Sequence, residues 1–187
     1  MIKVIFLDRD GVISIDKGYN HKIEDFELEK NIIPALKLLK KNGFSFIVVT
    51  NQSGIGRGIY TEDDFWKYNN CVTDELSKNG IEILKTYFSP YHPEKGIGKY
   101  KKKTRCRKPE PGMLEEAEKD FGIDNEHSWI IGDKWSDVKT GKNFGIKAIL
   151  VLTGHAGDDA EKHKTEVEFI AQDPLDAAEF IIRNENS

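Results

Sequence analysis

The sequence predicts an α/β fold: a three-layer, Rossmann-like parallel sheet with helices on both faces and no separate cap domain. Two observations lead to this prediction. Short apolar runs that are typical of buried strands alternate with segments whose apolar residues recur at helical spacing. Strands separated by crossover helices form a parallel, doubly wound sheet. At 187 residues, the chain 1–187 is expected to form one domain with a sizeable core.

The predicted strands are the apolar runs that lie between turn or loop residues. They cover residues 2–7, 44–49, 81–88, 128–131 and 146–152. The polar stretch 12–30 after the first strand is too irregular for a helix, and residues 89–106 form a loop insertion rich in proline, glycine and lysine. Neither stretch is large enough for a separate cap, so both are expected to wall the site as loops.

The crossover helices carry start signals. Residues 31–41 have Pro34 in the first turn, and Thr61 with Asp64 forms a capping box for the helix after the second strand. The remaining helices are predicted at residues 111–121, at residues 136–143 and after Asp173-Pro174.

The composition excludes some classes of function. The formal net charge is −4 with 32% charged residues, which is not typical of a nucleic-acid-binding chain. No apolar run is long enough to span a bilayer, and the amino terminus leads directly into the first strand, so no signal peptide is expected. The two cysteines, Cys71 and Cys106, form no disulfide framework. We expect a cytoplasmic monomer without nucleic-acid or membrane partners.

Asp8 and Asp10 follow the first strand, two positions apart. Residues i and i+2 share a side of an extended chain, so both carboxylates can face one spot at the carboxyl end of the strand. Open α/β sheets bind their ligands at that edge. Two carboxylates in one place are costly unless a cation or a shared proton relieves them. The pair therefore indicates Mg²⁺, a nucleophile or an acid/base pair.

Polar residues also follow the other central strands and the loop insertion. They are Thr50 and Asn51, Arg107 and Lys108, and the group Asp133, Lys134 and Asp137. A few carboxylates suit Mg²⁺, which keeps its waters and a substrate phosphate. A threonine hydroxyl, backbone N–H groups and a lysine suit phosphate oxygens.

These clusters resemble, in their order, the four motifs of the haloacid-dehalogenase-like (HAD-like) phosphohydrolases. The motifs are Asp8-x-Asp10, Thr50, Lys108 and Gly132-Asp133-x-x-x-Asp137. The longer segments 6–12, 50–55 and 107–113 are similar to the branch of heptose-bisphosphate and histidinol-phosphate phosphatases. The resemblance covers roughly residues 2–154 and implies the HAD-like version of the predicted fold.

The resemblance implies a role for each motif. Asp8 would attack phosphorus and form an aspartyl-phosphate, while Asp10 would act as general acid and then as general base. Thr50 and Lys108 would hold the equatorial phosphate oxygens. Mg²⁺ would be held by Asp8, Asp133 and the carbonyl oxygen of Asp10.

Further positions follow from the same resemblance. Asp137 would orient Lys108 or a metal-bound water. Arg107 would bind the substrate away from the reacting centre, with Asn51 and Lys134 as additional substrate contacts.

Many members of this branch carry a zinc loop, with a Cys-x-His pair and a Cys-x-Cys pair before Arg-Lys-Pro. The four ligand positions fall here on Ser89, Tyr91, Thr104 and Cys106, and only the last is of a ligand type. A tetrahedral site needs four ligands, so the sequence predicts no structural zinc. The loop is basic instead, and we expect it to help bind a second phosphate. Its basic residues, within fourteen positions without an acid, are Lys95, Lys99, Lys101, Lys102, Lys103, Arg105, Arg107 and Lys108.

The predicted function is Mg²⁺-dependent hydrolysis of a phosphorylated sugar, with D-glycero-D-manno-heptose 1,7-bisphosphate 7-phosphatase activity favoured. Histidinol-phosphate phosphatase is the first alternative, but a basic loop is poorly suited to an amine. A nucleic-acid end phosphatase ranks lower because few aromatic residues interleave with the lysines. A non-catalytic phosphate-binding scaffold would need neither Asp8 nor Asp10.

Overall fold

The apolar runs of the sequence pair side by side in one parallel sheet. The computed structural model describes residues 1–155 and 167–185. Within this part of the chain the sheet has six strands in the order β3-β2-β1-β4-β5-β6, and every neighbouring pair is parallel. The strands are β1 (Val4–Leu7), β2 (Ser45–Asn51), β3 (Ile83–Ser89), β4 (Trp129–Gly132), β5 (Lys147–Val151) and β6 (Phe169–Ala171). The predicted α/β parallel fold is confirmed.

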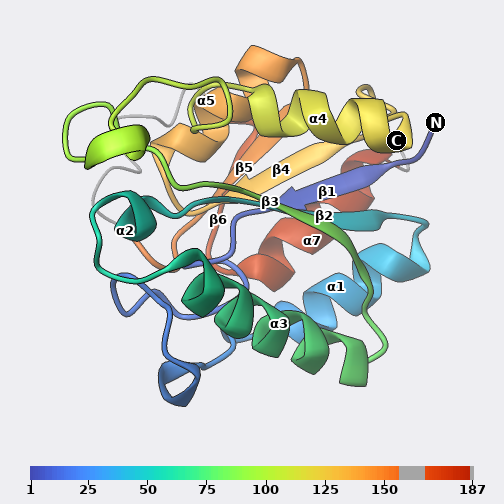
Figure 1. Cartoon of the computed structure of the whole chain (residues 1–187). Helices are drawn as coiled ribbons and strands as arrows, with labels where there is room; N and C mark the ends of the chain where they lie inside the picture. The colour runs from blue at the N-terminus through green and yellow to red at the C-terminus, as the bar shows by residue number, and fades with distance from the viewer. Residues whose placement is uncertain (156–166, 186–187) are drawn as a thin grey trace.

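Helices cover both faces of the sheet. Those of the described residues are α1 (Ile32–Lys41), α2 (Ser53–Gly56), α3 (Glu62–Lys78), α4 (Gly112–Phe121), α5 (Trp135–Phe144) and α7 (Pro174–Glu185). Figure 1 shows α4 and α5 on one face and α1, α3 and α7 on the other. Short 3₁₀ turns, η1 (Ile23–Asp25) and η2 (Gly98–Tyr100), lie within the two predicted loops. The capping box that was predicted at Thr61 and Asp64 begins α3.

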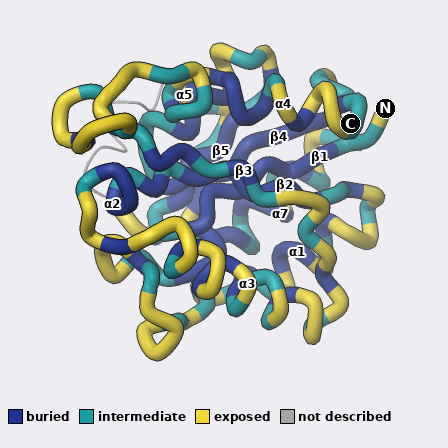
Figure 2. Tube along the Cα trace, in the orientation of Figure 1, coloured by how far each residue is buried: buried dark blue, intermediate teal, exposed yellow. Residues whose placement is uncertain are grey.

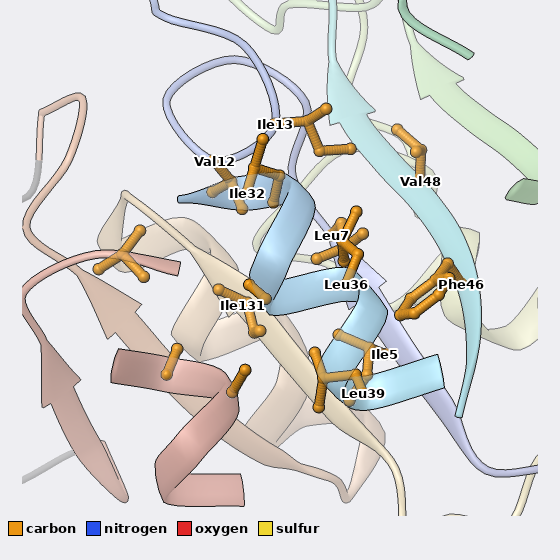
Figure 3. Packing of buried hydrophobic residues seen from close by; sticks show 14 of the residues in the cluster. Ile5, Leu7, Val12, Ile13, Ile32, Leu36, Leu39, Phe46, Val48 and Ile131 are labelled. Carbon is orange, nitrogen blue, oxygen red and sulfur yellow. The ribbon is translucent and has the colours of Figure 1, made fainter. Parts of the chain in front are cut away.

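Successive side chains of β1 enter two separate hydrophobic cores. Ile5 and Leu7 pack on the α1, α3 and α7 side, whereas Val4 and Phe6 pack on the α4 and α5 side. All four are fully buried, as expected for a central strand of a sheet that is covered on both faces. Figure 2 shows this buried interior, and Figure 3 shows Ile5 and Leu7 against α1. The two cores hold β1 rigidly between its neighbours.

The strand order brings the carboxyl ends of β1, β2 and β4 to one edge of the sheet. β1 lies between the other two, and the Asp8 amide donates to the Ile131 carbonyl at 3.0 Å. The loop between β3 and α4, together with α2, lies beyond this edge (Figure 1). Residues placed just after these three strands therefore face one common space.

Candidate active site

A cavity of about 400 Å³ opens at the carboxyl ends of β1 and β2. Two of the predicted site residues, Asp133 and Asp137, are fully buried next to this cavity. The predicted residues that line it are Asp8, Asp10, Thr50, Asn51, Arg107, Lys108 and Lys134. The structure thus brings together side chains from four separate segments of the chain.

Lys108 joins two of the predicted carboxylates. Its Nζ lies 3.0 Å from Asp8 Oδ1 and 2.5 Å from Asp137 Oδ1, and it donates to the Val49 carbonyl at 2.8 Å. Burial by itself would lower the pKa of Lys108, but Asp137 and Asp8 raise it, so the ammonium stays charged. All three of its hydrogens have acceptors, so Lys108 here positions Asp8, and a phosphate oxygen must replace one of these contacts to be bound.

Asp8, Asp133 and Asp137 form a carboxylate cluster that fits a divalent cation. One oxygen of each lies within 4.8 Å of the others. Asp133 Oδ1 is buried without a hydrogen-bond partner among the described residues. Burial, and then the charge of Asp8, raise the pKa of Asp133 to about 7. A hard cation with oxygen ligands would satisfy the free oxygen and relieve this repulsion, and these properties fit Mg²⁺.

Gly11 leaves the space that Asp133 occupies. Its φ is +90°, and a Cβ at this position would lie 2.4 Å from Asp133 Oδ2. Any other residue would be strained and would displace the carboxylate. The glycine after Asp8-x-Asp10 is thus explained by the close approach of β1 and β4.

Lys134 lies at the wall of the cavity in an ion-pair network. Its Nζ is 3.2 Å from Asp16 Oδ2 and 3.4 Å from Asp133 Oδ2. Burial alone would lower the pKa of Lys134, but the surrounding carboxylates, Asp8 first among them, raise it. His155 Nε2 also lies 3.2 Å from Asp16 Oδ2. Sequence reasoning missed Asp16 and His155, because nothing in the irregular loops marks which polar residues turn inward.

Asn51 lines the cavity, but its amide is occupied by the backbone of Lys108. Its Nδ2 donates to the Lys108 carbonyl and its Oδ1 accepts from the Lys108 amide, both at 3.0 Å. This pair of bonds ties the loop before α4 to the end of β2. Asn51 therefore holds the segment that presents Lys108, and its predicted contact with substrate stays a prediction.

Arg107 lines the cavity, and its guanidinium has no carboxylate partner among the described residues. Its Nη1 donates to the Tyr91 carbonyl at 2.9 Å. Burial, and then the like charge of Arg57, lower the pKa of Arg107. Two neighbouring guanidinium groups without a counter-charge favour an anionic ligand at this wall.

The lysines of the basic loop other than Lys108 do not line the cavity. Lys101, Lys102 and Lys103 are exposed and do not line it, and Lys102 Nζ lies over the Tyr91 ring instead, 4.6 Å from its centroid. Lys103 lines a neighbouring cavity together with Arg107. Of the basic loop, Arg107 and Lys108 are the residues placed to meet a substrate.

Three of the four positions that would carry zinc ligands meet in the structure. The Cys106 thiol donates to Ser89 Oγ at 3.6 Å and lies 3.1 Å from Thr104 Oγ1. Tyr91 contributes its backbone carbonyl to Arg107. The absence of zinc stays a prediction, but these contacts join the loop to the end of β3.

Asp10 is held by residues that sequence reasoning did not single out. Arg9 donates to both of its oxygens at 3.1 and 3.0 Å, and the Arg9 guanidinium is fully buried over the rings of Phe65 and Tyr68. Asn20 donates to Asp10 Oδ1 at 2.9 Å. Alternation along a strand places residue 9 opposite residues 8 and 10, so the strand pattern alone does not predict this contact.

The fold and the carboxylate-centred site define the class, and the chain belongs to the HAD-like hydrolases. A HAD-hydrolase-like family model matches residues 105–177. The chain is 40% identical over 96% of its length to a D-glycero-α-D-manno-heptose-1,7-bisphosphate 7-phosphatase of Burkholderia mallei, of which 93% is covered. It is 43% identical over 82% of its length to the Photorhabdus laumondii protein of that name, of which 85% is covered.

Solved structures agree on the fold. The crystal structure of D,D-heptose 1,7-bisphosphate phosphatase from B. bronchiseptica, complexed with magnesium and phosphate, superposes with a TM-score of 0.85. The match covers 98% of this chain and 99% of that one, at 22% identity. No helix in the described part of the chain is long and apolar enough to cross a membrane.

Proposed function

We propose that the protein is a Mg²⁺-dependent phosphatase that removes the 7-phosphate of D-glycero-D-manno-heptose 1,7-bisphosphate. The observation that supports this chemistry is the position of Asp8. It lines the cavity, contacts Lys108 and belongs to the carboxylate cluster that fits a divalent cation. The names of its relatives support the sugar. Action as a monomer in the cytoplasm, by a single domain, stays a prediction.

In the first step Asp8 attacks phosphorus. The bond between phosphorus and the ester oxygen breaks, its electron pair stays on that oxygen, and the oxygen takes a proton from Asp10. The Thr50 hydroxyl and Lys108 bind the phosphate oxygens while charge spreads over them. When bound by Asp8, Asp133 and the Asp10 carbonyl, Mg²⁺ supplies positive charge that offsets repulsion between nucleophile and phosphate.

In the second step water hydrolyses the aspartyl-phosphate on Asp8. Asp10 has given up its proton and now takes one from the attacking water. Phosphate leaves, and Asp8 returns to its contact with Lys108.

Arg107 is the residue we assign to the second phosphate of the substrate. It lies on the cavity wall with Arg57 nearby and without a carboxylate. A bisphosphate supplies the missing negative charge, whereas histidinol phosphate would bring an ammonium group toward two cations. The wall therefore favours the heptose bisphosphate over the alternative substrate.

The test is phosphate release with Mg²⁺ from both anomers of the heptose bisphosphate, histidinol phosphate and fructose 1,6-bisphosphate. We expect the heptose bisphosphate to have the highest kcat/KM and Asp8→Asn to abolish turnover. Arg107→Ala should raise KM for the bisphosphate by about tenfold, because it removes one charge-assisted contact.

Two outcomes would contradict the proposal. Turnover that persists in Asp8→Asn would exclude the covalent mechanism. Faster hydrolysis of histidinol phosphate than of either heptose ester would be consistent with the proposed phosphatase mechanism but would contradict the proposed substrate.

A further inference from the structure

Gln52 is a buried polar side chain at the end of β2 that the steps above do not use. It lines the catalytic cavity, and only 2% of its surface is exposed. Its Nε2 donates to Asp10 Oδ2 at 2.9 Å and to Thr50 Oγ1 at 2.9 Å. One amide nitrogen therefore joins the acid/base residue to the phosphate-binding hydroxyl.

Tyr60 fixes the orientation of this amide. Its hydroxyl donates to Gln52 Oε1 at 2.5 Å, and the ring packs against Ile55 and Phe65. Burial raises the pKa of Tyr60, so the phenol keeps the proton that it donates. The reverse orientation would point the amide oxygen at the Asp10 carboxylate and lose the hydrogen bond to it, whereas the present orientation satisfies Asp10, Thr50 and Tyr60 together.

The contact with Gln52 also orients the Thr50 hydroxyl. A hydroxyl has one hydrogen and two acceptor positions. Because Gln52 fills one acceptor position, the Thr50 hydrogen is left to donate, and no other described residue takes it. A phosphate oxygen in the cavity is the acceptor that this arrangement lacks.

Gln52 reaches Asp10 from the neighbouring strand. The other donors to this carboxyl, Arg9, Ser14 and Asn20, all come from β1 or the loop that follows it. The contact from β2 therefore fixes the position of Asp10 relative to the phosphate site. Loss of that contact would leave Asp10 bound but free to shift from the ester oxygen.

We propose that Gln52, oriented by Tyr60, is a positioning residue that sets Asp10 and Thr50 for proton transfer to the leaving oxygen. The proposal rests on the proposed phosphatase function. In the step concerned, the P–O bond breaks as Asp8 bonds to phosphorus, and the proton of Asp10 moves to the ester oxygen. A small displacement of Asp10 slows this step when the leaving group needs the proton.

The test compares two esters that differ in this need. The sugar departs from a heptose bisphosphate as an alkoxide, which needs the proton, whereas p-nitrophenyl phosphate releases a stable p-nitrophenolate, which does not. The value of kcat/KM reports only the steps up to release of the leaving group. It therefore does not include the later step in which Asp10 takes a proton from water. We expect Gln52→Met to lower kcat/KM on the heptose ester by about tenfold more than on the aryl ester. Tyr60→Phe should shift this ratio in the same direction by about threefold.

The chain offers a matched control in its other glutamine. Gln172→Met makes the same change at an exposed position and should leave both values of kcat/KM unchanged. Equal losses on both esters in Gln52→Met and Tyr60→Phe would overturn the positioning role and leave only a structural one. Should Gln52→Met fail to fold, Tyr60→Phe decides alone. A wild-type protein that hydrolyses neither ester would overturn the proposed function, a result distinct from an unchanged ratio.

Discussion

Lys108 is the residue on which the electrostatics of the site depend most. It is 3% exposed and pairs with two buried carboxylates, Asp8 and Asp137. Removing one partner of a buried ion pair leaves an uncompensated charge and typically costs ~3–5 kcal/mol. The residue that we propose binds the phosphate is therefore also expected to stabilise the fold.

We expect Lys108→Met to abolish phosphatase activity and to lower the free energy of unfolding by ~3 kcal/mol at pH 7. Without the ammonium, Asp8 and Asp137 repel each other, so the variant holds a proton in the folded state that the unfolded chain has released. The stability of the variant should therefore fall as the pH rises from 5 to 7. Urea unfolding at both pH values measures this.

Lys78→Met is a matched control for this change. Lys78 pairs with Glu75 at 3.0 Å on the exposed face of α3. Its removal should leave both stability and activity unchanged. A Lys108→Met protein with an equal deficit at pH 5 and pH 7 would contradict the electrostatic explanation.

The residues around Asp10 mark the limit of sequence reasoning at this scale. Asp8, Thr50 and Asp133 could be predicted because each lies at the carboxyl end of a strand or directly after it. Arg9 could not, since alternation along a strand assigns its side chain to the face opposite Asp8 and Asp10, and Gln52 lies on the side of Thr50 but belongs to none of the four motif positions. Arg9 lies over the rings of Phe65 and Tyr68, from a distant part of the chain, and Gln52 is hydrogen-bonded to Tyr60 and Asp10.

At the scale of elements, the end of β3 and the loop before α4 form one unit. Cys106 lies 3.6 Å from Ser89 and 3.1 Å from Thr104. Sulfur ligands of a tetrahedral zinc are about 3.7 Å apart, given Zn–S bonds of about 2.3 Å. The loop thus brings its side chains to a spacing that zinc could occupy, although only one of them is a ligand.

The triple substitution Ser89→Cys, Tyr91→His and Thr104→Cys should therefore create a zinc site. We expect about one zinc per chain after expression with zinc and dialysis, and none in the wild-type protein. Elemental analysis measures both. Adding Cys106→Ser should abolish retention, and zinc in the wild-type protein would show that the predicted absence is wrong.

Two elements were not predicted from the sequence, β6 (Phe169–Ala171) and α2 (Ser53–Gly56). β6 has three residues, and α2 has four, two of them glycine. Segments of this length carry no periodicity, and glycine disfavours helix. β6 forms by pairing with β5, and residue 55 of α2 packs with Tyr60 and Phe65. Whether such short elements form depends on their tertiary contacts, whereas the longer strands could be predicted from apolar runs alone.

At the scale of the whole molecule, the carboxylate cluster links metal binding to stability. With the pKa of Asp133 raised to about 7, the metal-free folded protein holds a proton that the unfolded chain has lost. Its stability therefore falls as the pH rises from about 4 to about 7. Mg²⁺ bound by Asp133, as proposed, would replace that proton, so it should bind more favourably when the carboxyl is already ionised.

We expect Mg²⁺ to raise the unfolding temperature of chelator-treated protein more at pH 8 than at pH 6. Thermal unfolding with and without the ion measures this difference. Asp133→Asn should remove both the Mg²⁺ effect and its dependence on pH. A shift of equal size at the two pH values would exclude Asp133 as the titrating ligand.

Arg9 has a further consequence because its charge is sealed from solvent. Dissolved ions screen charges that they can approach, and they reach buried pairs much less. The Arg9 guanidinium is fully buried over the rings of Phe65 and Tyr68, whereas Arg107 borders the cavity. If Arg107 and Asp10 act as proposed, added salt should therefore weaken the capture of the substrate more than it slows the proton transfer from Asp10.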